Sequence, residues 1–353
     1  ENGFESSIVS WLVQHNGYEQ GSNADYNKEI AMDETRLFRF LNTTQADKMK
    51  QLRLENDPLE KEKFLQRLDQ SLHTNGVIDL LRKGFRYKHL VLDMFYVRPS
   101  PGNETAAKLY AQNIFSVTRQ LQYSRQNPLL ALDVCLFLNG LPIATMELKN
   151  QLTKQNAADA VKQYKDERTP DEVLFGFKRC IVHFAVDDNE VRMCTELKGQ
   201  KSWFLPFNKG YNDGAGNPPN PDGIKTDYLW KEILRKDDFS NIIENYVQII
   251  CDEDEETHKK SYKQIFPRYH QLQLVTSLLA DAKRDGVGKR YLIQHSAGSG
   301  KSNSIAWLAH QLVTLKDATD HNIFDTVIVV TDRVNLDKQI RNTIRQFMQV
   351  SST

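Results

Sequence analysis

Cysteine is scarce in this sequence, and its spacing excludes two common roles. The four cysteines among 353 residues lie far apart, with no C-x-x-C pair. They are Cys135, Cys180, Cys194 and Cys251. Structural zinc sites draw on such short spacings, and disulfide frameworks are typical of small secreted domains. We therefore expect neither a zinc site nor a disulfide framework.

Long apolar runs and a net charge are absent too. No apolar segment reaches the roughly 18 residues that cross a bilayer, and the N-terminus has no signal-peptide core. The 46 basic and 46 acidic residues give a formal net charge of zero. These features predict a soluble, cytoplasmic protein that has no membrane partner.

The charge is unevenly distributed, although it cancels overall. Residues 259–353 hold 14 Lys and Arg against 7 Asp and Glu, a net charge of +7, which leaves −7 for residues 1–258. A basic segment favours a polyanionic partner, but such a bias often serves solubility alone. The length of the chain suits about two domains.

Helical and extended patterns alternate along the first 250 residues, which predicts an α/β fold. An apolar face over residues 4–12 indicates a first helix. The further expectations are helical composition at 45–82, a strand at 89–97, a helix near 104–117, a hairpin over 132–150, a helix at 156–168 and a second hairpin at 179–197.

The composition changes after residue 205. Residues 206–223 hold four Pro, four Gly and four Asn and should form a loop. A helical segment at 228–250 is then followed by the acidic run 252–256. We therefore predict a first domain at 1–240, an acidic linker at 241–260 and a second domain at 261–353.

A strand, a glycine-rich loop and a helix follow one another at 290–312 and indicate a phosphate-binding loop. The loop HSAGSGKS (295–302) fits G-x-x-x-x-G-K-[ST] except at its first position, where His295 replaces glycine. The glycines let backbone N–H groups converge on phosphate, the lysine reaches the β- and γ-phosphates, and the serine hydroxyl binds Mg²⁺. The residues expected to bind ATP are Gly298, Ser299, Gly300, Lys301 and Ser302.

Two flanking segments support this interpretation. Gln271 precedes an amphipathic helix, where a helicase glutamine reads the adenine edge, although an ordinary surface glutamine explains it equally well. Residues 326–340 begin with a β-branched run typical of a buried parallel strand, which ends in Thr-Asp-Arg at 331–333. No strand ending in Asp-Glu follows, so we expect only the first part of a RecA-like parallel-sheet helicase lobe.

Three charged residues interrupt the apolar hairpin at 132–150, namely Asp133, Glu147 and Lys149. An unpaired buried charge costs several kcal/mol, so these side chains need partners. An Asp followed by Glu-x-Lys on the next strand is similar to the PD-(D/E)xK nucleases. Mg²⁺ prefers carboxylate and carbonyl oxygens, so we expect Asp133 and Glu147, with the Leu148 carbonyl, to hold it. Lys149 shares a strand face with Glu147 and can orient water or neutralise charge, so all three residues are candidate catalytic residues.

The same Glu-Leu-Lys motif occurs again at 196–198, after two acids that lie in a turn. We interpret this second copy as an exposed strand end. The alternative explanation of the first copy is a surface salt bridge between Asp133 and Lys149.

The hairpin sets a geometric condition on a shared metal. A plain two-residue turn at Asn139-Gly140 would place Asp133 and Glu147 on opposite sheet faces. A bulge or an odd-length loop is therefore required, and we expect the three-residue loop 138–140 with Gly140 in the left-handed conformation.

Several segments together resemble one family. FESSIV at the start, the hairpin, FLPFNKG, YLWKEIL, HSAGSGKS and VTDRVNLDKQ are similar to the restriction (R) subunit of type I restriction-modification enzymes. The resemblance implies a PD-(D/E)xK nuclease domain, a central mixed sheet flanked by helices, followed by a superfamily 2 translocase. It implies Mg²⁺-dependent cleavage of double-stranded DNA, coupled to ATP-driven translocation.

The resemblance also implies partner subunits, and it leaves the roles of two residues, Glu5 and Tyr164, undecided. The R subunit docks on modification and specificity subunits, so S-adenosylmethionine is expected on the modification subunit and not on this chain. Glu5 could reach the metal, as a helix glutamate does in some relatives, or be a plain helix acid. Tyr164 has Ala160 where many relatives have glutamine, which favours packing over a role in the site.

Two other functions stay open. One is a translocase or remodeller with an inactive, DNA-binding nuclease domain, and the other is a DNA repair nuclease-helicase. Decay of a nuclease usually removes one of its three charged residues, whereas all three are present here. In repair enzymes the nuclease commonly follows the motor, whereas here it precedes it.

Overall fold

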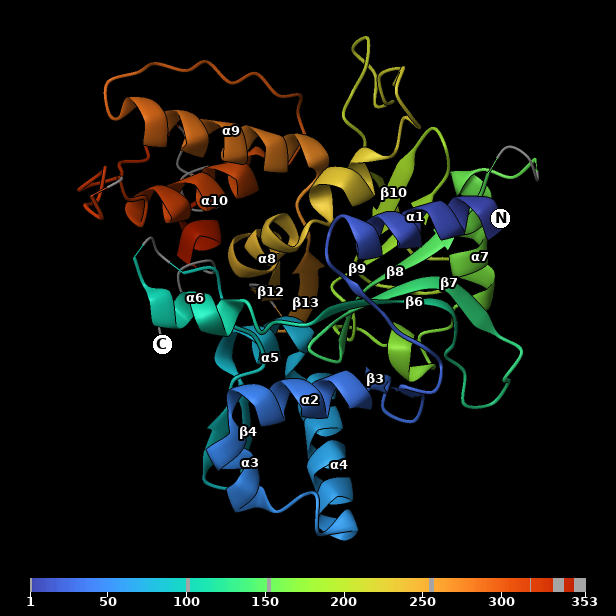
Figure 1. Ribbon diagram of the computed structural model, residues 1–353. Coiled ribbons are helices and arrows are strands. Elements are labelled where there is room, and N and C mark those ends of the chain that lie inside the picture. The colour runs from blue at the N-terminus through green and yellow to red at the C-terminus, as the bar shows by residue number, and fades with distance from the viewer. Residues whose placement is uncertain are drawn as a thin grey trace. The chain divides into compact units, whose positions relative to one another are not determined.

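The computed structural model describes residues 2–99, 102–150, 154–253, 257–317, 319–332 and 340–345 (Figure 1). The chain divides into two compact units. Unit 1 comprises residues 1–99 and 104–266, and unit 2 comprises residues 100–103 and 267–353.

A seven-stranded mixed sheet forms the centre of unit 1, in the order β1-β6-β7-β8-β9-β10-β11. The β1–β6 and β8–β9 pairs are parallel, and the other pairs are antiparallel. The strands are β1 (Glu19–Gln20), β6 (Phe115–Gln122), β7 (Ala131–Leu138), β8 (Leu141–Leu148), β9 (Val182–Val186), β10 (Val191–Cys194) and β11 (Leu205–Pro206). Every residue of β8 is buried, because the strand has neighbours on both edges and packed layers on its faces.

Helices cover the sheet, so the predicted α/β class is confirmed. Helix α1 (Asn2–Gln14) contacts β1 and β6, and α7 (Ala157–Glu167) contacts β8, β9 and β10 (Figure 1). The predicted apolar face of α1 is buried at Phe4, Ile8 and Leu12. Helix α7 starts as expected, because Asn156 accepts a hydrogen bond from the Ala158 N–H and forms a capping box with Asp159.

A helical region follows β1 in the chain. The predicted helical stretch 45–82 is confirmed, with a break at residues 53–57. The region contains α2 (Glu34–Thr44), α3 (Ala46–Leu52), α4 (Pro58–Asn75) and α5 (Val77–Lys83), with the short hairpins β2 (Tyr26–Asn27)–β3 (Met32–Asp33) and β4 (Phe85–Tyr87)–β5 (Leu90–Leu92). The predicted strand at 89–97 is thus limited to the three residues of β5.

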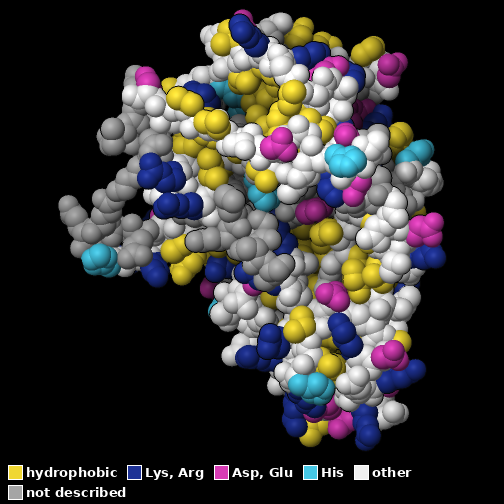
Figure 2. Space-filling view, turned by 90° about the vertical axis from the view of Figure 1, so that its left-hand side faces the viewer, with side chains coloured by type: hydrophobic (Ala, Val, Ile, Leu, Met, Phe, Trp, Pro, Cys, Tyr) yellow, Lys and Arg dark blue, Asp and Glu magenta, His cyan; other side chains and the backbone are white. Residues whose placement is uncertain are grey.

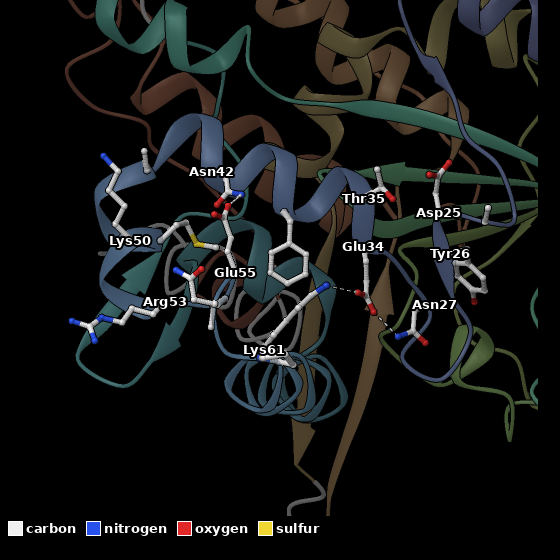
Figure 3. Close-up of a pocket in the computed structure, with 17 residues that line it drawn as sticks. Asp25, Tyr26, Asn27, Glu34, Thr35, Asn42, Lys50, Arg53, Glu55 and Lys61 are labelled. Carbon is white, nitrogen blue, oxygen red and sulfur yellow. Dashed lines mark hydrogen bonds and ion pairs between the residues drawn. The ribbon is translucent and has the colours of Figure 1, made fainter.

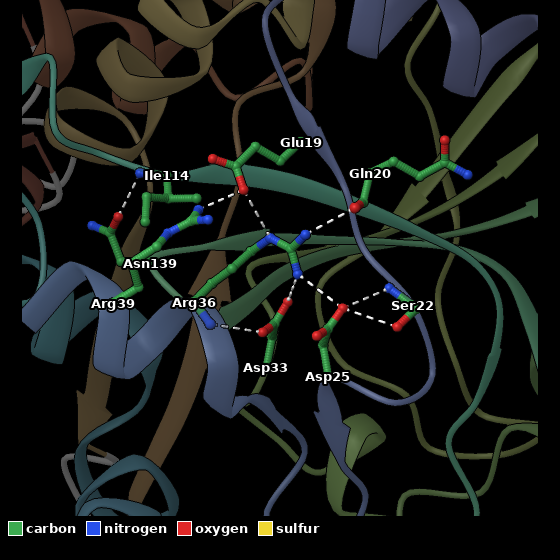
Figure 4. A network of polar contacts seen from close by, with 9 residues as sticks. All are labelled: Glu19, Gln20, Ser22, Asp25, Asp33, Arg36, Arg39, Ile114 and Asn139. Carbon is green, nitrogen blue, oxygen red and sulfur yellow. Dashed lines mark hydrogen bonds and ion pairs between the residues drawn. The ribbon is translucent and has the colours of Figure 1, made fainter. Parts of the chain in front are cut away.

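The buried side chain of Arg36 joins α2 to the segment before it (Figure 4). Its guanidinium forms ion pairs with Asp33 at 2.7 Å, Asp25 at 3.2 Å and Glu19 at 3.2 Å. It also donates to the Gln20 carbonyl at 2.8 Å. These contacts fix the 19–33 segment against the edge of the sheet.

The helix predicted at 104–117 is only partly correct. Helix α6 (Glu104–Tyr110) ends at Tyr110, and residues from Phe115 onward form β6. Phe115 pairs with Leu138 of β7, and Ser116 pairs with Glu19 of β1. Hydrogen bonds to strands on both edges outweigh the local helical pattern here.

The boundary between the units differs from the predicted one. A π-helical turn η3 (Leu229–Ile233) and α8 (Lys236–Asn245) precede the hairpin β12 (Gln248–Glu253)–β13 (Lys260–Ile265), which occupies the predicted linker. The Gln264 side-chain amide donates to the carbonyls of Cys180 and Ile181, both at 2.8 Å. These long-range contacts keep the hairpin in unit 1. Residues 254–256 of the acidic run lie outside the described residues.

Unit 2 contains α9 (Tyr269–Asp285) and α10 (Lys301–Val313). The strands predicted at 290–294 and 326–330 are not formed, and Leu292 and Ile328 are 95% and 80% exposed. A parallel strand needs a neighbour for its N–H and C=O groups. The described part of unit 2 offers only an isolated bridge between Lys316 and Asn322, so these runs remain unpaired.

No helix among the described residues combines the length and the apolar character that crossing a membrane requires.

Candidate metal site and phosphate-binding loop

The β7–β8 hairpin meets the geometric condition by a bulge. Leu138 pairs with Leu141 across a two-residue turn, in which Asn139 and Gly140 have φ angles of 50° and 82°. The register then shifts, so that Leu136 pairs with Ala144. The expected three-residue loop is wrong, and the register is shifted instead by a bulge, the other way to meet the condition. The left-handed conformation of Gly140 is confirmed.

A bulge contains one residue more on one strand than on its partner. Two local features explain where this extra residue lies in the hairpin. Asn-Gly readily adopts positive φ at both positions, which gives a tight turn that matches the twist of the strands. Pro142 follows the turn and has no N–H to donate to the ladder, so the strand tolerates a bulge beside it. The extra residue is therefore Ile143, inside β8 rather than in the loop.

The bulge places the two predicted carboxylates opposite each other. Val134 pairs with Met146, so the next position along the ladder sets Asp133 against Glu147. One Asp133 oxygen accepts a hydrogen bond from the Leu148 N–H at 2.7 Å. The structure thus brings Asp133 and Glu147 together on one sheet face.

Glu147 is a fully buried carboxylate with one occupied oxygen. Its Oε1 lies 2.6 Å from Nε of Arg168, which is also buried. Its Oε2 is buried without a hydrogen-bond partner. Burial raises the pKa of Glu147, a rise that the Arg168 guanidinium opposes and Asp133 increases. Burial alone would lower the pKa of Arg168, but the Glu147 carboxylate raises it above its ordinary range.

These groups fit a hard divalent cation. Mg²⁺ takes carboxylate and carbonyl oxygens and keeps several waters, so it needs few protein ligands. Glu147 Oε2 is an unsatisfied buried oxygen of the required kind, and Asp133 lies across the ladder from it. Within the described ranges no group of three or more His, Cys, Asp and Glu side chains could hold a metal. The candidate site therefore rests on two carboxylates, with the Leu148 carbonyl as the expected third oxygen.

Lys149 follows the end of β8. Its main-chain N–H donates to the Val186 carbonyl at 2.9 Å, which continues the parallel pairing with β9. In an extended backbone positions 147 and 149 share a face, and this placement of the Lys149 side chain stays a prediction. The side chain is only 7% exposed.

Glu5 is connected to the candidate site through Gln120, which the sequence did not single out. The Glu5 carboxylate is buried and accepts hydrogen bonds from Arg119 Nε at 2.6 Å and Gln120 Nε2 at 2.8 Å. The same Gln120 nitrogen lies 3.3 Å from Asp133 Oδ1. Gln120 has a φ of 45° inside β6, an uncommon backbone state that tends to occur at functional sites.

Tyr164 packs inside the core of unit 1. It is fully buried, and its hydroxyl shares a hydrogen bond of 2.9 Å with Thr145 Oγ1. Thr145 in turn lies 2.7 Å from Nδ1 of His183. Tyr164 is thus a core residue beneath β8, which agrees with the packing role favoured by the sequence.

The second Glu-Leu-Lys motif follows β10, which ends at Cys194, and is not itself part of a strand. Lys198 is exposed, Glu196 is half-buried and Leu197 is buried, so the interpretation as an exposed strand end is only partly correct. Glu196 and Lys198 form an ion pair of 2.7 Å at the protein surface. The upstream Asp187 follows β9 and accepts a hydrogen bond from the Ala157 N–H at the start of α7. Asp187 therefore has a structural partner of its own.

At its C-terminal end the phosphate-binding loop has glycines with positive φ angles and leads directly into a helix. Gly298 and Gly300 have φ angles of 73° and 82°, and α10 begins at Lys301. The Lys301 ammonium donates to the carbonyls of His295 at 3.0 Å and Ser296 at 2.9 Å. Ser299 and Ser302 complete the predicted set, and Ser299 Oγ is buried without a hydrogen-bond partner.

Gln271 lies against this loop. Its side-chain nitrogen donates to the Gly300 carbonyl at 2.9 Å, and its oxygen accepts from the Arg268 N–H at 2.9 Å. The contact with adenine stays a prediction. Thr331 and Asp332 are in irregular structure, and Arg333 lies outside the described residues.

A separate cavity of about 1130 Å³ opens between α2, α3 and the start of α4 (Figure 3). Phe38 is one of the residues that line it, and the Lys61 ammonium lies 4.6 Å from the centroid of the Phe38 ring. Lys61 also pairs with Glu34 at 3.4 Å. On the face in Figure 2, basic and acidic side chains are interspersed around these helices, so neither sign of charge prevails there. No predicted site residue lines this cavity.

Comparison with known proteins gives matches for both parts of the chain. Residues 1–202 match the family model described as the type I restriction enzyme R protein N terminus, and residues 270–353 match that of the SWI2/SNF2 ATPase. The chain is 26% identical over 243 residues to the type I restriction enzyme HindI endonuclease subunit of Haemophilus influenzae. It is 24% identical over 247 residues to a Methanocaldococcus jannaschii protein named for the MjaVIIIP type I restriction enzyme endonuclease subunit.

These alignments cover 66% of this chain but only 22% and 21% of the two relatives. The chain therefore spans about a fifth of the length of the curated relatives that it matches.

Proposed function

The chain belongs to the family of type I restriction enzyme R protein N termini, and on that premise we propose that unit 1 is a metal-dependent DNA endonuclease. The observation that carries the proposal is the pairing of Asp133 with Glu147 across the bulged hairpin. Two carboxylates on one face, with Lys149 two positions further, are the groups that phosphodiester hydrolysis with Mg²⁺ requires.

Each residue has a distinct part in this proposal. Asp133 and Glu147 Oε2 would hold the metal, which would supply polarisation of the scissile phosphate and a water of lowered pKa. The Leu148 N–H restrains the Asp133 carboxylate through its 2.7 Å hydrogen bond. Lys149 neutralises charge on the phosphate as the bond to the leaving oxygen breaks.

Unit 2 is proposed to bind ATP at the loop 295–302. Its glycines expose backbone N–H groups, and α10 directs its positive end toward the loop. Two hydrogens of the Lys301 ammonium bond loop carbonyls, and an ammonium has a third for a phosphate oxygen. Gln271 supports the loop from α9 and is proposed to contact adenine.

The complete protein is proposed to couple the two activities. ATP-driven translocation of double-stranded DNA would precede Mg²⁺-dependent cleavage. Modification and specificity subunits are the proposed partners, with S-adenosylmethionine on the modification subunit. This assignment extends the printed names of the relatives to this chain and is a proposal for that reason.

The test is plasmid cleavage by the complete complex with Mg²⁺ and ATP. Glu147→Ala or Lys149→Ala should reduce cleavage by about 10²–10³-fold, the usual cost of removing a group that stabilises the transition state. ATP hydrolysis should persist, because the phosphate loop belongs to the other unit.

The second Glu-Leu-Lys motif provides a matched control. Glu196→Ala and Lys198→Ala remove the same residue types from the segment after β10, where the two side chains pair with each other, and should leave cleavage unchanged. Equal loss of cleavage and ATPase activity in the Glu147 and Lys149 variants would instead assign these residues a purely structural role.

A further inference from the structure

A buried cation contacts the candidate metal site from outside the predicted motif. Arg168 follows α7 and is 2% exposed. Its Nε donates to Glu147 Oε1 at 2.6 Å, one terminal nitrogen donates to the Tyr123 hydroxyl at 2.9 Å, and the other donates to the Ala131 carbonyl at 2.9 Å. The guanidinium is thus fixed at three points, on β8, after β6 and at the start of β7.

Stability alone does not explain this arrangement. Removing two charges from water is costly, and a buried ion pair is often no more stabilising than apolar side chains of equal volume. The pair is also only half satisfied, because Glu147 Oε2 is buried without a hydrogen-bond partner. A carboxylate with one oxygen clamped and one unsatisfied is suited to present that second oxygen to a cation.

We propose that Arg168 is a positioning residue that clamps Glu147 Oε1 and thereby directs Oε2 to the divalent metal. The inference rests on the proposed nuclease function and adds a residue that the motif does not contain. Groups that orient a metal ligand typically affect metal affinity by about 10- to 100-fold. Lysine cannot reproduce the three-point contact, because only the planar guanidinium presents its donors in a fixed fork.

The first measurement is Mg²⁺ binding to the full chain by calorimetry, without DNA or turnover. Arg168→Lys should weaken binding by about 10-fold and Arg168→Met by more, since methionine has no donor. Tyr123→Phe removes one anchor of Arg168 without touching the carboxylate and should cause a smaller loss. Glu147→Gln removes the proposed metal ligand, so the binding heat that this variant loses is the part that belongs to this site.

Arg179 provides the matched control. It is another buried arginine of unit 1, paired with Asp69 at 2.6 Å, and none of its described contacts is with Glu147 or Asp133. Arg179→Lys therefore reports the general effect of weakening a buried ion pair. It should leave Mg²⁺ affinity unchanged even where it lowers thermal stability.

The second measurement is plasmid cleavage by the complete complex over a range of Mg²⁺ concentrations. Arg168→Lys should raise the Mg²⁺ concentration at half-maximal cleavage and recover much of the rate at saturation. Glu147→Gln should not recover its cleavage rate at any Mg²⁺ concentration.

One result would overturn the role of Arg168 and leave the nuclease proposal standing. In it, folded Arg168→Lys and Tyr123→Phe bind Mg²⁺ with wild-type affinity, while Glu147→Gln loses binding. Wild-type binding that Glu147→Gln does not change would overturn both, because the metal would then lie elsewhere.

Discussion

At the scale of single residues, the charges and polar groups of unit 1 are paired in specific combinations. Arg168 binds Glu147, and Arg119 and Gln120 bind Glu5. Each of these partners lies far in the sequence from the carboxylate that it binds. Breaking one partner of a buried pair costs about 3–5 kcal/mol, because the other charge stays buried. Substitutions at the site therefore need a stability measurement beside each activity measurement.

His183 gives a residue-scale prediction about pH. Burial lowers its pKa to about 3, so the folded protein keeps the ring neutral in mild acid. The unfolded chain binds a proton below about pH 6.5. Stability should therefore fall as the pH drops from about 6.5 toward 3, by about 1.4 kcal/mol per pH unit from this residue.

The measurement is the free energy of unfolding from urea titrations across this pH interval. His183→Asn can keep an acceptor for the Thr145 hydroxyl but cannot be protonated, so its stability should decline less steeply in acid. Identical slopes for the two proteins would mean that His183 is protonated in the folded state.

At the scale of elements, the β7–β8 hairpin determines whether the carboxylates can share a metal. A one-residue change of register moves every following side chain of a strand to the opposite face. The bulge at Pro142 and Ile143 supplies that change, and Asn139-Gly140 closes the turn. The site is thus a consequence of strand register as much as of residue type.

A substitution at Gly140 tests how closely the β7–β8 turn packs against Asp33 and Leu37. A Cβ there would lie 2.4 Å from the Asp33 carbonyl oxygen and 2.6 Å from Leu37 Cβ, and the φ of 82° is strained for other residues. Gly140→Ala should cost about 1–3 kcal/mol for the backbone and a similar amount for overpacking. The unfolding free energy measures both.

Gly210 is the matched control for the backbone contribution. Its φ is 87°, but the nearest atom to an added Cβ is the Gly214 oxygen at 3.7 Å. Gly210→Ala should therefore show the conformational cost alone. An equal cost at the two positions would contradict the close contact between the turn and α2.

The phosphate loop gives a second element-scale prediction. A Cβ on Gly300 would lie 2.4 Å from the Gln271 amide nitrogen, whereas Gly298 has open space around the same position. Gly300→Ala should displace Gln271 and weaken ATP binding, measured by calorimetry, more than Gly298→Ala does. A larger effect at Gly298 would instead indicate that direct approach of phosphate to that glycine dominates.

At the scale of the whole molecule, the two candidate sites belong to separate units. In the complete complex, Glu147→Ala should reduce cleavage by about 10²–10³-fold and keep ATP hydrolysis. Lys301→Ala should abolish ATP hydrolysis and, if translocation precedes cutting, cleavage as well. Mg²⁺ binding by the Lys301 variant of the full chain should equal that of the wild type. Cleavage that continues without ATP hydrolysis would show that the two activities are not coupled.

Local interactions made much of this protein predictable from its sequence. The turn at Asn139-Gly140, the capped start of α7 and the start of α10 at Lys301 each depend on residues a few positions apart. The different setting of the second Glu-Leu-Lys motif was recognisable for the same reason, because its upstream acids fall in a turn. The alternation of strands and helices likewise indicated the α/β class.

Contacts between distant segments decided the rest. Pairing on both edges turned residues 115–117 into a strand, and Gln264 drew the β12–β13 hairpin into unit 1. The runs of unit 2 that were predicted as strands form none, because strand formation depends on neighbours that a local pattern does not supply. The sequence by itself determined which residues are candidates for the chemistry. Only the tertiary structure decided that Arg168 would contact Glu147 and that Gln120 would contact Asp133, because side chains far apart in sequence meet only after the strands have paired.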